Sequence, residues 1–226
     1  MDVCKNYEKV DMALVEKFAK LEESASINEC LKENGALQHD FRPVWPGIRS
    51  CGRAFTVLAR AGDNLILHKA ITMLQPGDFL VVACDGFQES GGMWGGIMST
   101  AALTMGCVGM VIDGCVRDTM LMKKVGFNVW SRGISVKRST KIAPGKINVP
   151  IIIGNVSVNP GDLIFADNDA VVVVPREQAL SVYELAAERE AKEDKSLEIV
   201  LKDGTYTFLG NQAFKTEYDR LRLEEE

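Results

Sequence analysis

The chain of 226 residues is 46% hydrophobic and 25% charged, a composition typical of one globular domain that buries a substantial core. Its net charge of -5, from 26 basic and 31 acidic residues, argues against nucleic acid and anionic membrane surfaces as partners. No apolar stretch reaches the ~18 residues that a membrane span needs, and the charged start MDVCKNYEKVD does not resemble a secretion signal. We therefore expect a single cytoplasmic domain over residues 1–226.

The first half of the chain alternates helical and extended patterns. Residues 10–34 carry apolar side chains at helical spacing, which predicts one helix that ends at Gly35. Two prolines and a glycine make residues 39–53 a loop. Beyond this loop we expect a strand over 54–59, a helix over 64–74, a Pro-Gly-Asp turn at 76–78 and a strand over 79–83.

The second half opens with a helix over 97–105 and a buried strand over 108–112. Short strands are expected at 150–153 and 163–166, around a second Pro-Gly-Asp turn at 160–162. Four valines make 170–174 a fully buried strand, residues 176–194 predict a long amphipathic helix, and the charged stretch 212–226 is a solvated helix or a tail. The two Pro-Gly-Asp segments hint at an internal repeat, but this tripeptide is a common turn and we favour the turn.

The most informative stretch runs from Gly91 to Asp118 and contains Gly95-Gly96 at an expected helix start. The backbone N–H groups of Ile97 and Met98 would be among the unpaired donors of that helix, and with the helix dipole they would bind a carboxylate or phosphate. Glycines that merely allow tight packing are an equally good explanation. The spacing is not that of a dinucleotide-binding loop, and no Walker-type phosphate loop occurs.

Arg117 and Asp118 follow the apolar run 108–112. An arginine can hold a carboxylate with two parallel hydrogen bonds, and an aspartate can ligate a divalent cation. Neighbours on an extended strand point to opposite faces, so if both serve one site the chain must already have turned. The alternatives are a surface ion pair or a helix cap.

Other candidate residues favour structural roles. Six cysteines without a C-x-x-C pair are read as small buried hydrophobes, and two histidines make a zinc site improbable, so any metal would be a hard ion on oxygen ligands. His68 fits a helical pattern and is expected to be structural, Trp94 and Trp130 are expected in the core, and Asp167 and Asp169 predict a hairpin turn.

Several blocks together resemble one family. They are Gly77-Asp78, Met93-Trp94-Gly95, Val111-Ile112-Asp113-Gly114 through Arg117-Asp118, Arg132-Gly133, Asn148-Val149-Pro150, Pro160-Gly161-Asp162, Val171 to Pro175, Arg189 to Glu193, and Ala61-Gly62-Asp63-Asn64-Leu65. They resemble the class II pyruvate aldolases that cleave 4-hydroxy-4-methyl-2-oxoglutarate and 4-carboxy-4-hydroxy-2-oxoadipate, and the RraA-like proteins named after a regulator of ribonuclease E. The resemblance covers roughly residues 10 to 200.

The resemblance implies a three-layer swivelling β/β/α domain that assembles as a homotrimer or a dimer of trimers, with sites between subunits. It implies that Asp118 binds Mg²⁺ or Mn²⁺, and that Arg117, Gly95, Gly96 and the amides of Ile97 and Met98 hold the pyruvate part of a 2-oxo acid. It also implies that Glu193 of a neighbouring subunit contacts the metal through water. Glu29 matches a further acidic position.

One departure from the family pattern concerns the reaction. The aldolases carry an acid where this chain has Gly96, and RraA-like members with glycine there often carry an acid where this chain has Leu121. Retro-aldol cleavage must remove a proton from the 4-hydroxyl, whereas oxaloacetate decarboxylation needs no such base. We expect a metal-dependent lyase in which decarboxylation exceeds aldol cleavage. The alternative is a non-catalytic RraA-type regulator of ribonuclease activity; a methyltransferase is disfavoured, since no glycine-rich cofactor loop follows the first strand.

Overall fold

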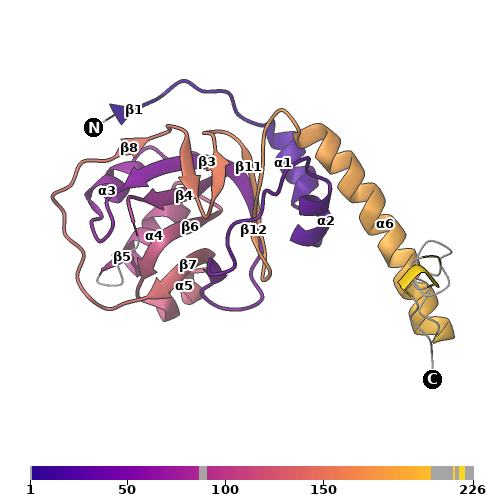
Figure 1. Cartoon of the computed structure of the whole chain (residues 1–226). Coiled ribbons are helices and arrows are strands. Elements are labelled where there is room, and N and C mark those ends of the chain that lie inside the picture. Colours follow the sequence, from indigo (N-terminus) through magenta and orange to yellow (C-terminus); the bar gives the residue numbers. More distant parts are fainter. Residues whose placement is uncertain (1, 87–90, 205–215, 217–218, 222–226) are drawn as a thin grey trace.

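The computed structural model describes residues 2–86, 91–204, 216 and 219–221 (Figure 1). Its strands are β1 (Asp2–Val3), β2 (Arg42–Pro43), β3 (Ser50–Ala59), β4 (Asp78–Cys84), β5 (Gly92–Trp94), β6 (Gly109–Val116), β7 (Val129–Ile134), β8 (Lys146–Ile147), β9 (Ile151–Ile153), β10 (Val156–Val158), β11 (Leu163–Ala166) and β12 (Val171–Val174). Its helices are α1 (Met12–Phe18), α2 (Ser24–Glu29), α3 (Leu65–Ile71), α4 (Gly96–Thr104), α5 (Thr119–Val125) and α6 (Ala179–Asp203). No helix in these ranges is long and apolar enough to cross a membrane.

Four parallel strands, in the order β3, β4, β6 and β7, form the centre of a mixed sheet. Helices α3, α4 and α5 lie in the connections between successive strands of this set. The carboxyl ends of parallel strands meet at one edge of a sheet, where α/β proteins commonly bind ligands. On the far side of β3 the antiparallel hairpin β11–β12 completes the sheet.

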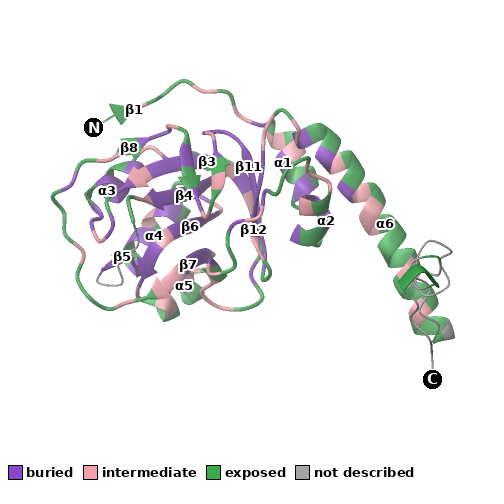
Figure 2. Cartoon of the chain, in the orientation of Figure 1, coloured by how far each residue is buried: buried purple, intermediate pink, exposed green. Residues whose placement is uncertain are grey.

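The side chains of the parallel strands alternate between two hydrophobic cores, as a period of two requires. Leu80 and Ile112 pack with α3, α4 and α5. Phe79, Val81 and Val111 pack on the opposite face, against β9, β10, β11 and β12. Figure 2 shows these strands buried at the centre of the molecule. The three-layer β/β/α arrangement is therefore confirmed.

A third core lies on the outer side of the β11–β12 hairpin. Phe165 and Val172 pack there against Phe18 of α1, Ile27 of α2 and Val182 of α6. These helices lie beyond the hairpin, on the side of the molecule away from α3 and α4, and α6 extends past the rest of the domain (Figure 1).

The single helix expected over 10–34 is wrong, because the segment forms two short helices. The backbone N–H groups of Glu22 and Glu23 donate to the Glu190 carboxylate at 3.0 and 3.1 Å, and that of Ser24 donates to Asp167 at 2.8 Å. These acceptors lie about 140 residues or more away in sequence, so side chains distant in the chain replace the helical carbonyls and interrupt the helix.

The remaining boundaries differ locally. Strand β6 continues to Val116 instead of ending at 112, and α6 occupies 179–203 instead of 176–194. Helix α5 and strand β7 were not expected from the sequence. Of the charged stretch 212–226, only residues 216 and 219–221 lie among the described residues.

The expected turns are confirmed. In both Pro-Gly-Asp segments the aspartate is 1% exposed and accepts a backbone hydrogen bond from the residue three positions earlier, at 2.9 Å for Asp78 and 2.8 Å for Asp162. Asp167 joins β11 to β12 and accepts from the backbone N–H groups of Asp169 and Ala170. Trp94 and Trp130 are fully buried, as expected.

Candidate active site

Arg117 and Asp118 lie where β6 has ended and α5 has not yet begun. The Arg117 backbone N–H donates to the Trp94 carbonyl at 2.9 Å, which ties the end of β6 to the end of β5. Asp118 has a left-handed backbone with φ of 60°, a conformation that is uncommon outside glycine and that aspartate tolerates comparatively well. The chain has therefore turned at this point, as a shared site requires.

The Asp118 side chain does not cap its own helix. It occupies the residue position before α5 without a capping hydrogen bond, and its Oδ2 instead accepts from the Gly96 backbone N–H at 3.1 Å. Arg117 Nε lies 4.0 Å from the same oxygen. Both side chains are partly exposed, at 39% and 49%, so this loose ion pair contributes little stability and leaves both groups accessible to a ligand.

Gly95 and Gly96 permit this close approach. A β-carbon at Gly95 would lie 2.7 Å from Asp118 Oδ2, and one at Gly96 would lie 2.8 Å from Cγ of Leu121. Tight packing thus accounts for both glycines. The same two residues also form the start of α4. The backbone N–H groups of Ile97 and Met98 belong to the first turn, where the helix supplies no acceptor.

The buried Trp94 supports the start of α4. Its indole Nε1 donates to Ser99 Oγ at 2.8 Å, and that hydroxyl donates to the Gly95 carbonyl at 3.1 Å. The helix start is therefore attached to the core, and its unpaired amides have a fixed direction.

These groups surround one cavity of about 220 Å³. Its lining includes Gly95, Ile97, Met98, Arg117 and Asp118, which the sequence singled out, while Gly96 takes part through its bond to Asp118. The other lining residues are Asn64, His68, Gly92, Met93 and Lys141. A wider hollow of about 570 Å³ lies between residues 8–14 and 176–180, but it is shallow and its Arg176 already pairs with Glu8 and Glu177.

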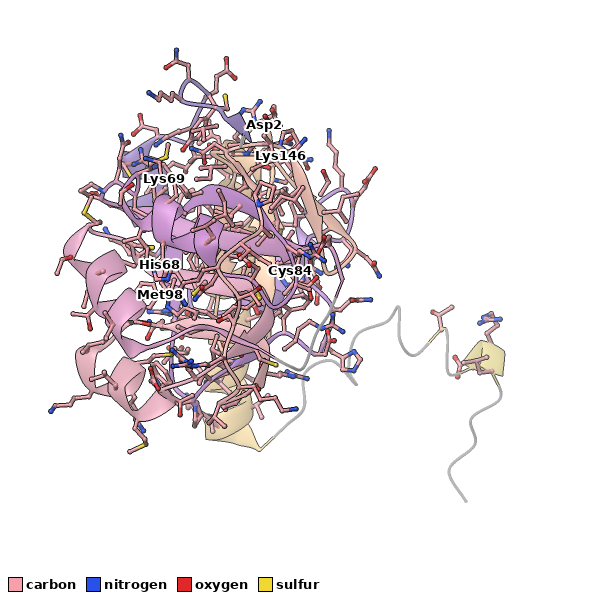
Figure 3. All side chains as sticks on the ribbon, turned by 90° about the vertical axis from the view of Figure 1, so that its left-hand side faces the viewer. Asp2, His68, Lys69, Cys84, Met98 and Lys146 are labelled. Carbon is pink, nitrogen blue, oxygen red and sulfur yellow. The ribbon has the colours of Figure 1, made fainter. Side chains whose placement is uncertain are left out.

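His68 and Lys141 are the ionisable lining residues that sequence reasoning missed. His68 was expected to be structural, but its side chain is exposed and faces the cavity from α3. Figure 3 shows His68 of α3 beside Met98 of α4 on this face of the molecule. Although the residue is exposed, partial desolvation of the imidazole and the nearby Lys141 charge lower the pKa of His68 below its usual range. The alternation of apolar and polar residues along a helix does not indicate which of its polar side chains will line a cavity.

Asp63 joins the two segments that carry His68 and Lys141. Its buried carboxylate accepts from the backbone N–H of Leu65 at 2.9 Å, at the start of α3. It also accepts from Thr140 Oγ1 and from the backbone N–H of Ile142, both at 2.7 Å, on either side of Lys141. Although burial tends to raise its pKa, these hydrogen bonds outweigh it and hold the pKa below the usual range.

Glu29 and Glu193 lie elsewhere in the protomer. Arg189 of α6 binds Glu29 of α2 at 2.6 Å and Glu193 at 2.8 Å, and Ser26 Oγ donates to Glu193 at 3.4 Å. Figure 1 places α2 and α6 beyond β11–β12, away from α4 and β5. One protomer therefore brings Arg117, Asp118 and the α4 amides together, but not the two glutamates.

A match to a family profile establishes which family the chain belongs to. Residues 16–173 match the profile of the RraA-like family, described as Aldolase/RraA. The chain belongs to this family. A protein from Halalkalibacterium halodurans, provisionally named a 4-hydroxy-4-methyl-2-oxoglutarate aldolase, is 34% identical over 177 residues, which cover 78% of this chain and 83% of that protein.

Two solved structures confirm the RraA-like fold. An uncharacterised protein from Pseudomonas syringae pv. tomato superposes with a TM-score of 0.78 at 26% identity, covering 89% of this chain and 98% of that one. Streptomyces coelicolor RraAS2, described as an unusual member of the RNase ES inhibitor RraA family, superposes with a TM-score of 0.75 at 27% identity, covering 84% and 98%. The RraA-like family thus includes proteins named as aldolases and proteins named as ribonuclease inhibitors.

Proposed function

We propose that this RraA-like protein is a divalent-metal-dependent carbon–carbon lyase that releases pyruvate from 2-oxo acids. Its reactions would be oxaloacetate decarboxylation, aldol cleavage of 4-hydroxy-4-methyl-2-oxoglutarate or 4-carboxy-4-hydroxy-2-oxoadipate, or both. The observation that carries the proposal is the shared cavity of Arg117, Asp118 and the first amides of α4. The aldolase name of the H. halodurans relative supports it.

The side chains of the cavity are compatible with a Mg²⁺ or Mn²⁺ ion whose other ligands would mostly be water and substrate. No cluster of three or more His, Cys, Asp or Glu side chains that could hold a metal occurs in the described part of the chain. Mg²⁺ commonly binds through one or two carboxylates and keeps several waters, and the half-exposed Asp118 supplies one such carboxylate. When bound, the ion would act as a Lewis acid on the keto oxygen of the substrate.

The chain's own groups would orient the 2-oxo acid. Arg117 can hold the substrate carboxylate with two parallel hydrogen bonds, and the Ile97 and Met98 amides can donate to the same group, with the dipole of α4 favouring its charge. Cleavage leaves negative charge on the pyruvate enolate. Fixed donors that face the developing charge stabilise the transition state.

The contact between Gly96 and Leu121 favours decarboxylation over aldol cleavage. Leu121 occupies the space that a side chain at position 96 would need, so neither position supplies an acid. Loss of CO₂ from oxaloacetate breaks a carbon–carbon bond without removing a proton, whereas aldol cleavage must deprotonate a hydroxyl.

We also propose that the complete site forms between subunits of a homotrimer or a dimer of trimers. Glu193, with Glu29 beside it, would then reach the metal-bound water of a neighbouring protomer. The separation of these glutamates from Asp118 within one protomer supports this arrangement.

The test is pyruvate release from oxaloacetate and from a panel of 2-oxo diacids with Mg²⁺. Arg117→Ala is expected to lower kcat on oxaloacetate by about 10²–10³, as does loss of one transition-state donor in other enzymes. The matched control is Arg138→Ala, which removes an exposed arginine that does not line the cavity. Retention of more than half of the wild-type rate by Arg117→Ala would refute the assignment.

A ribonuclease regulator is the second candidate, favoured by the name of the S. coelicolor neighbour. Such a protein would leave Asp118 without a ligand. Calorimetry with Mg²⁺ and oxalate, which mimics the pyruvate enolate, separates the two candidates, since a regulator without a lyase site would give no heat of binding.

A further inference from the structure

Ionisable side chains in the cavity differ in whether they can accept a proton. Within the described residues, four line it: His68, Arg117, Asp118 and Lys141. Arginine and lysine side chains ordinarily carry their protons at neutral pH, and Asp118 is assigned to the metal. Histidine is the side chain that ordinarily changes charge near neutral pH, so His68 is the candidate acceptor that a protomer supplies to its own cavity.

The backbone that carries His68 is held in place. The Asp63 carboxylate binds both the start of α3 and the segment around Lys141. The His68 backbone N–H donates to the Asn64 carbonyl at 3.3 Å, one helical turn earlier. The imidazole therefore projects from a fixed helix toward the cavity that holds Arg117 and Asp118.

Cationic groups near the imidazole favour its neutral form, whereas the Asp118 carboxylate opposes them. The cavity presents Arg117, Asp118 and Lys141, and Lys69 follows His68 on the same helix. Partial burial and the charge of Lys141 lower the pKa of His68. A neutral imidazole can accept a proton at physiological pH.

We propose that His68 is the general base of aldol cleavage in this protein. It would replace the acidic side chain that is absent at positions 96 and 121. This inference rests on the proposed lyase function and adds a residue to it. His68 would take the proton of the substrate 4-hydroxyl as the C3–C4 bond breaks. C4 becomes a carbonyl, the electron pair of the broken bond forms the pyruvate enolate, and the imidazolium returns its proton to C3 to give pyruvate.

The test compares His68→Gln with His39→Gln. The chain has two histidines, and His39 is exposed and does not line the cavity. Aldol cleavage of 4-hydroxy-4-methyl-2-oxoglutarate and decarboxylation of oxaloacetate are measured with Mg²⁺ between pH 5 and 8, the range in which an ordinary histidine changes charge. His68→Gln is expected to lower aldol kcat by about 10² or more, the usual size of a general-base contribution.

The pH profile and the second substrate separate a base from a structural residue. In wild type, aldol kcat/KM should fall as the pH drops through the pKa of His68. This acidic limb should disappear in His68→Gln, and decarboxylation, which removes no hydroxyl proton, should fall by a much smaller factor than aldol cleavage. Equal losses on both substrates, or a retained limb, would overturn the role of His68. Wild-type protein that decarboxylates oxaloacetate but cleaves no aldol would also overturn it while leaving the lyase proposal intact, and wild type inactive on both would remove the proposed function itself.

An NMR titration gives a readout independent of turnover. In the His39→Gln variant the remaining imidazole signal belongs to His68, and its midpoint should move on addition of Mg²⁺ and oxalate. If binding of oxalate is seen calorimetrically while this midpoint stays fixed, His68 does not face the ligand and the inference fails.

Discussion

Two residues that depart from the family patterns, Gly96 from the aldolases and Leu121 from the RraA-like members with glycine at position 96, are in contact with one another. Gly96 and Leu121 lie on different helices, and a β-carbon at Gly96 would meet the Cβ, Cγ and Cδ2 atoms of Leu121. The glycine and the leucine are therefore a packed pair, and a change at one position depends on the residue at the other.

We predict that Gly96→Glu is destabilised while Leu121 is present. Overpacking of this kind costs about 1–3 kcal/mol, and Gly96→Glu combined with Leu121→Ala should recover part of that loss. Thermal unfolding of the two single variants and the double variant measures the coupling, which for residues in contact is about 0.5–3 kcal/mol. Strictly additive effects would show that the two side chains do not compete for space.

The same double variant tests the proton argument. An acid at position 96 should raise aldol cleavage relative to decarboxylation, because only the first reaction removes a hydroxyl proton. An unchanged ratio of the two activities in the folded double variant would contradict that reasoning.

At the scale of elements, Asp63 connects α3 to the segment 140–143 across 77 residues or more of sequence. Hydrogen bonds in which the acceptor is a charged carboxylate are stronger than hydrogen bonds between neutral groups. Asp63 therefore fixes the relative position of His68 and Lys141, and its role is to position residues of the cavity.

Asp63→Asn is expected to lower the free energy of unfolding at pH 7 by about 1.5–3 kcal/mol, the range for hydrogen bonds to a charged group. The folded pKa of Asp63 is depressed, so its contribution is complete above the unfolded value of about 3.9 and is lost as the pH falls through the lower, folded value. Urea unfolding of both proteins should show a difference that shrinks below about pH 4. A difference that does not change with pH would mean that the carboxylate charge is not responsible.

The whole molecule presents two groups of polar residues on opposite sides of the β11–β12 hairpin. Arg117 and Asp118 line the cavity on one side, and Glu29, Arg189 and Glu193 cluster on the other. Since a small acid cannot span a domain, the two groups can serve one reaction only if they come from different protomers.

Intersubunit complementation tests this arrangement. Asp118→Ala and Glu193→Ala should each be nearly inactive on oxaloacetate, but their mixed oligomers should regain activity because some interfaces join the intact halves. Mixing Asp118→Ala with Arg117→Ala is the control, since both residues belong to the same half and no interface is restored. A mixture of the first pair that stays as inactive as its components would contradict the shared site.

Local rules allowed part of this structure to be predicted. Continuous apolar runs indicated the strands at 79–83 and 170–174, and turn chemistry indicated both Pro-Gly-Asp turns, because each depends on neighbouring residues. Helix α5 and strand β7 were missed, and residues 10–34 were read as one helix. The expected helix is interrupted by hydrogen bonds to Glu190 and Asp167. Because these two residues are distant in sequence, no local pattern predicts the interruption.

By itself the sequence indicated the part of the candidate site that comes from the stretch between Gly95 and Asp118. Gly95 to Met98 and Arg117-Asp118 stand at the start of a helix and the end of a strand, and their residue types suffice to suggest a carboxylate clamp beside a metal ligand. Only the tertiary structure decided that His68 and Lys141 belong to the same cavity, that Asp63 holds them there, and that Leu121 occupies the space beside Gly96. These relations join residues up to 80 positions apart, and such neighbours are created by packing of the sheet and its helices, which no short stretch of sequence specifies.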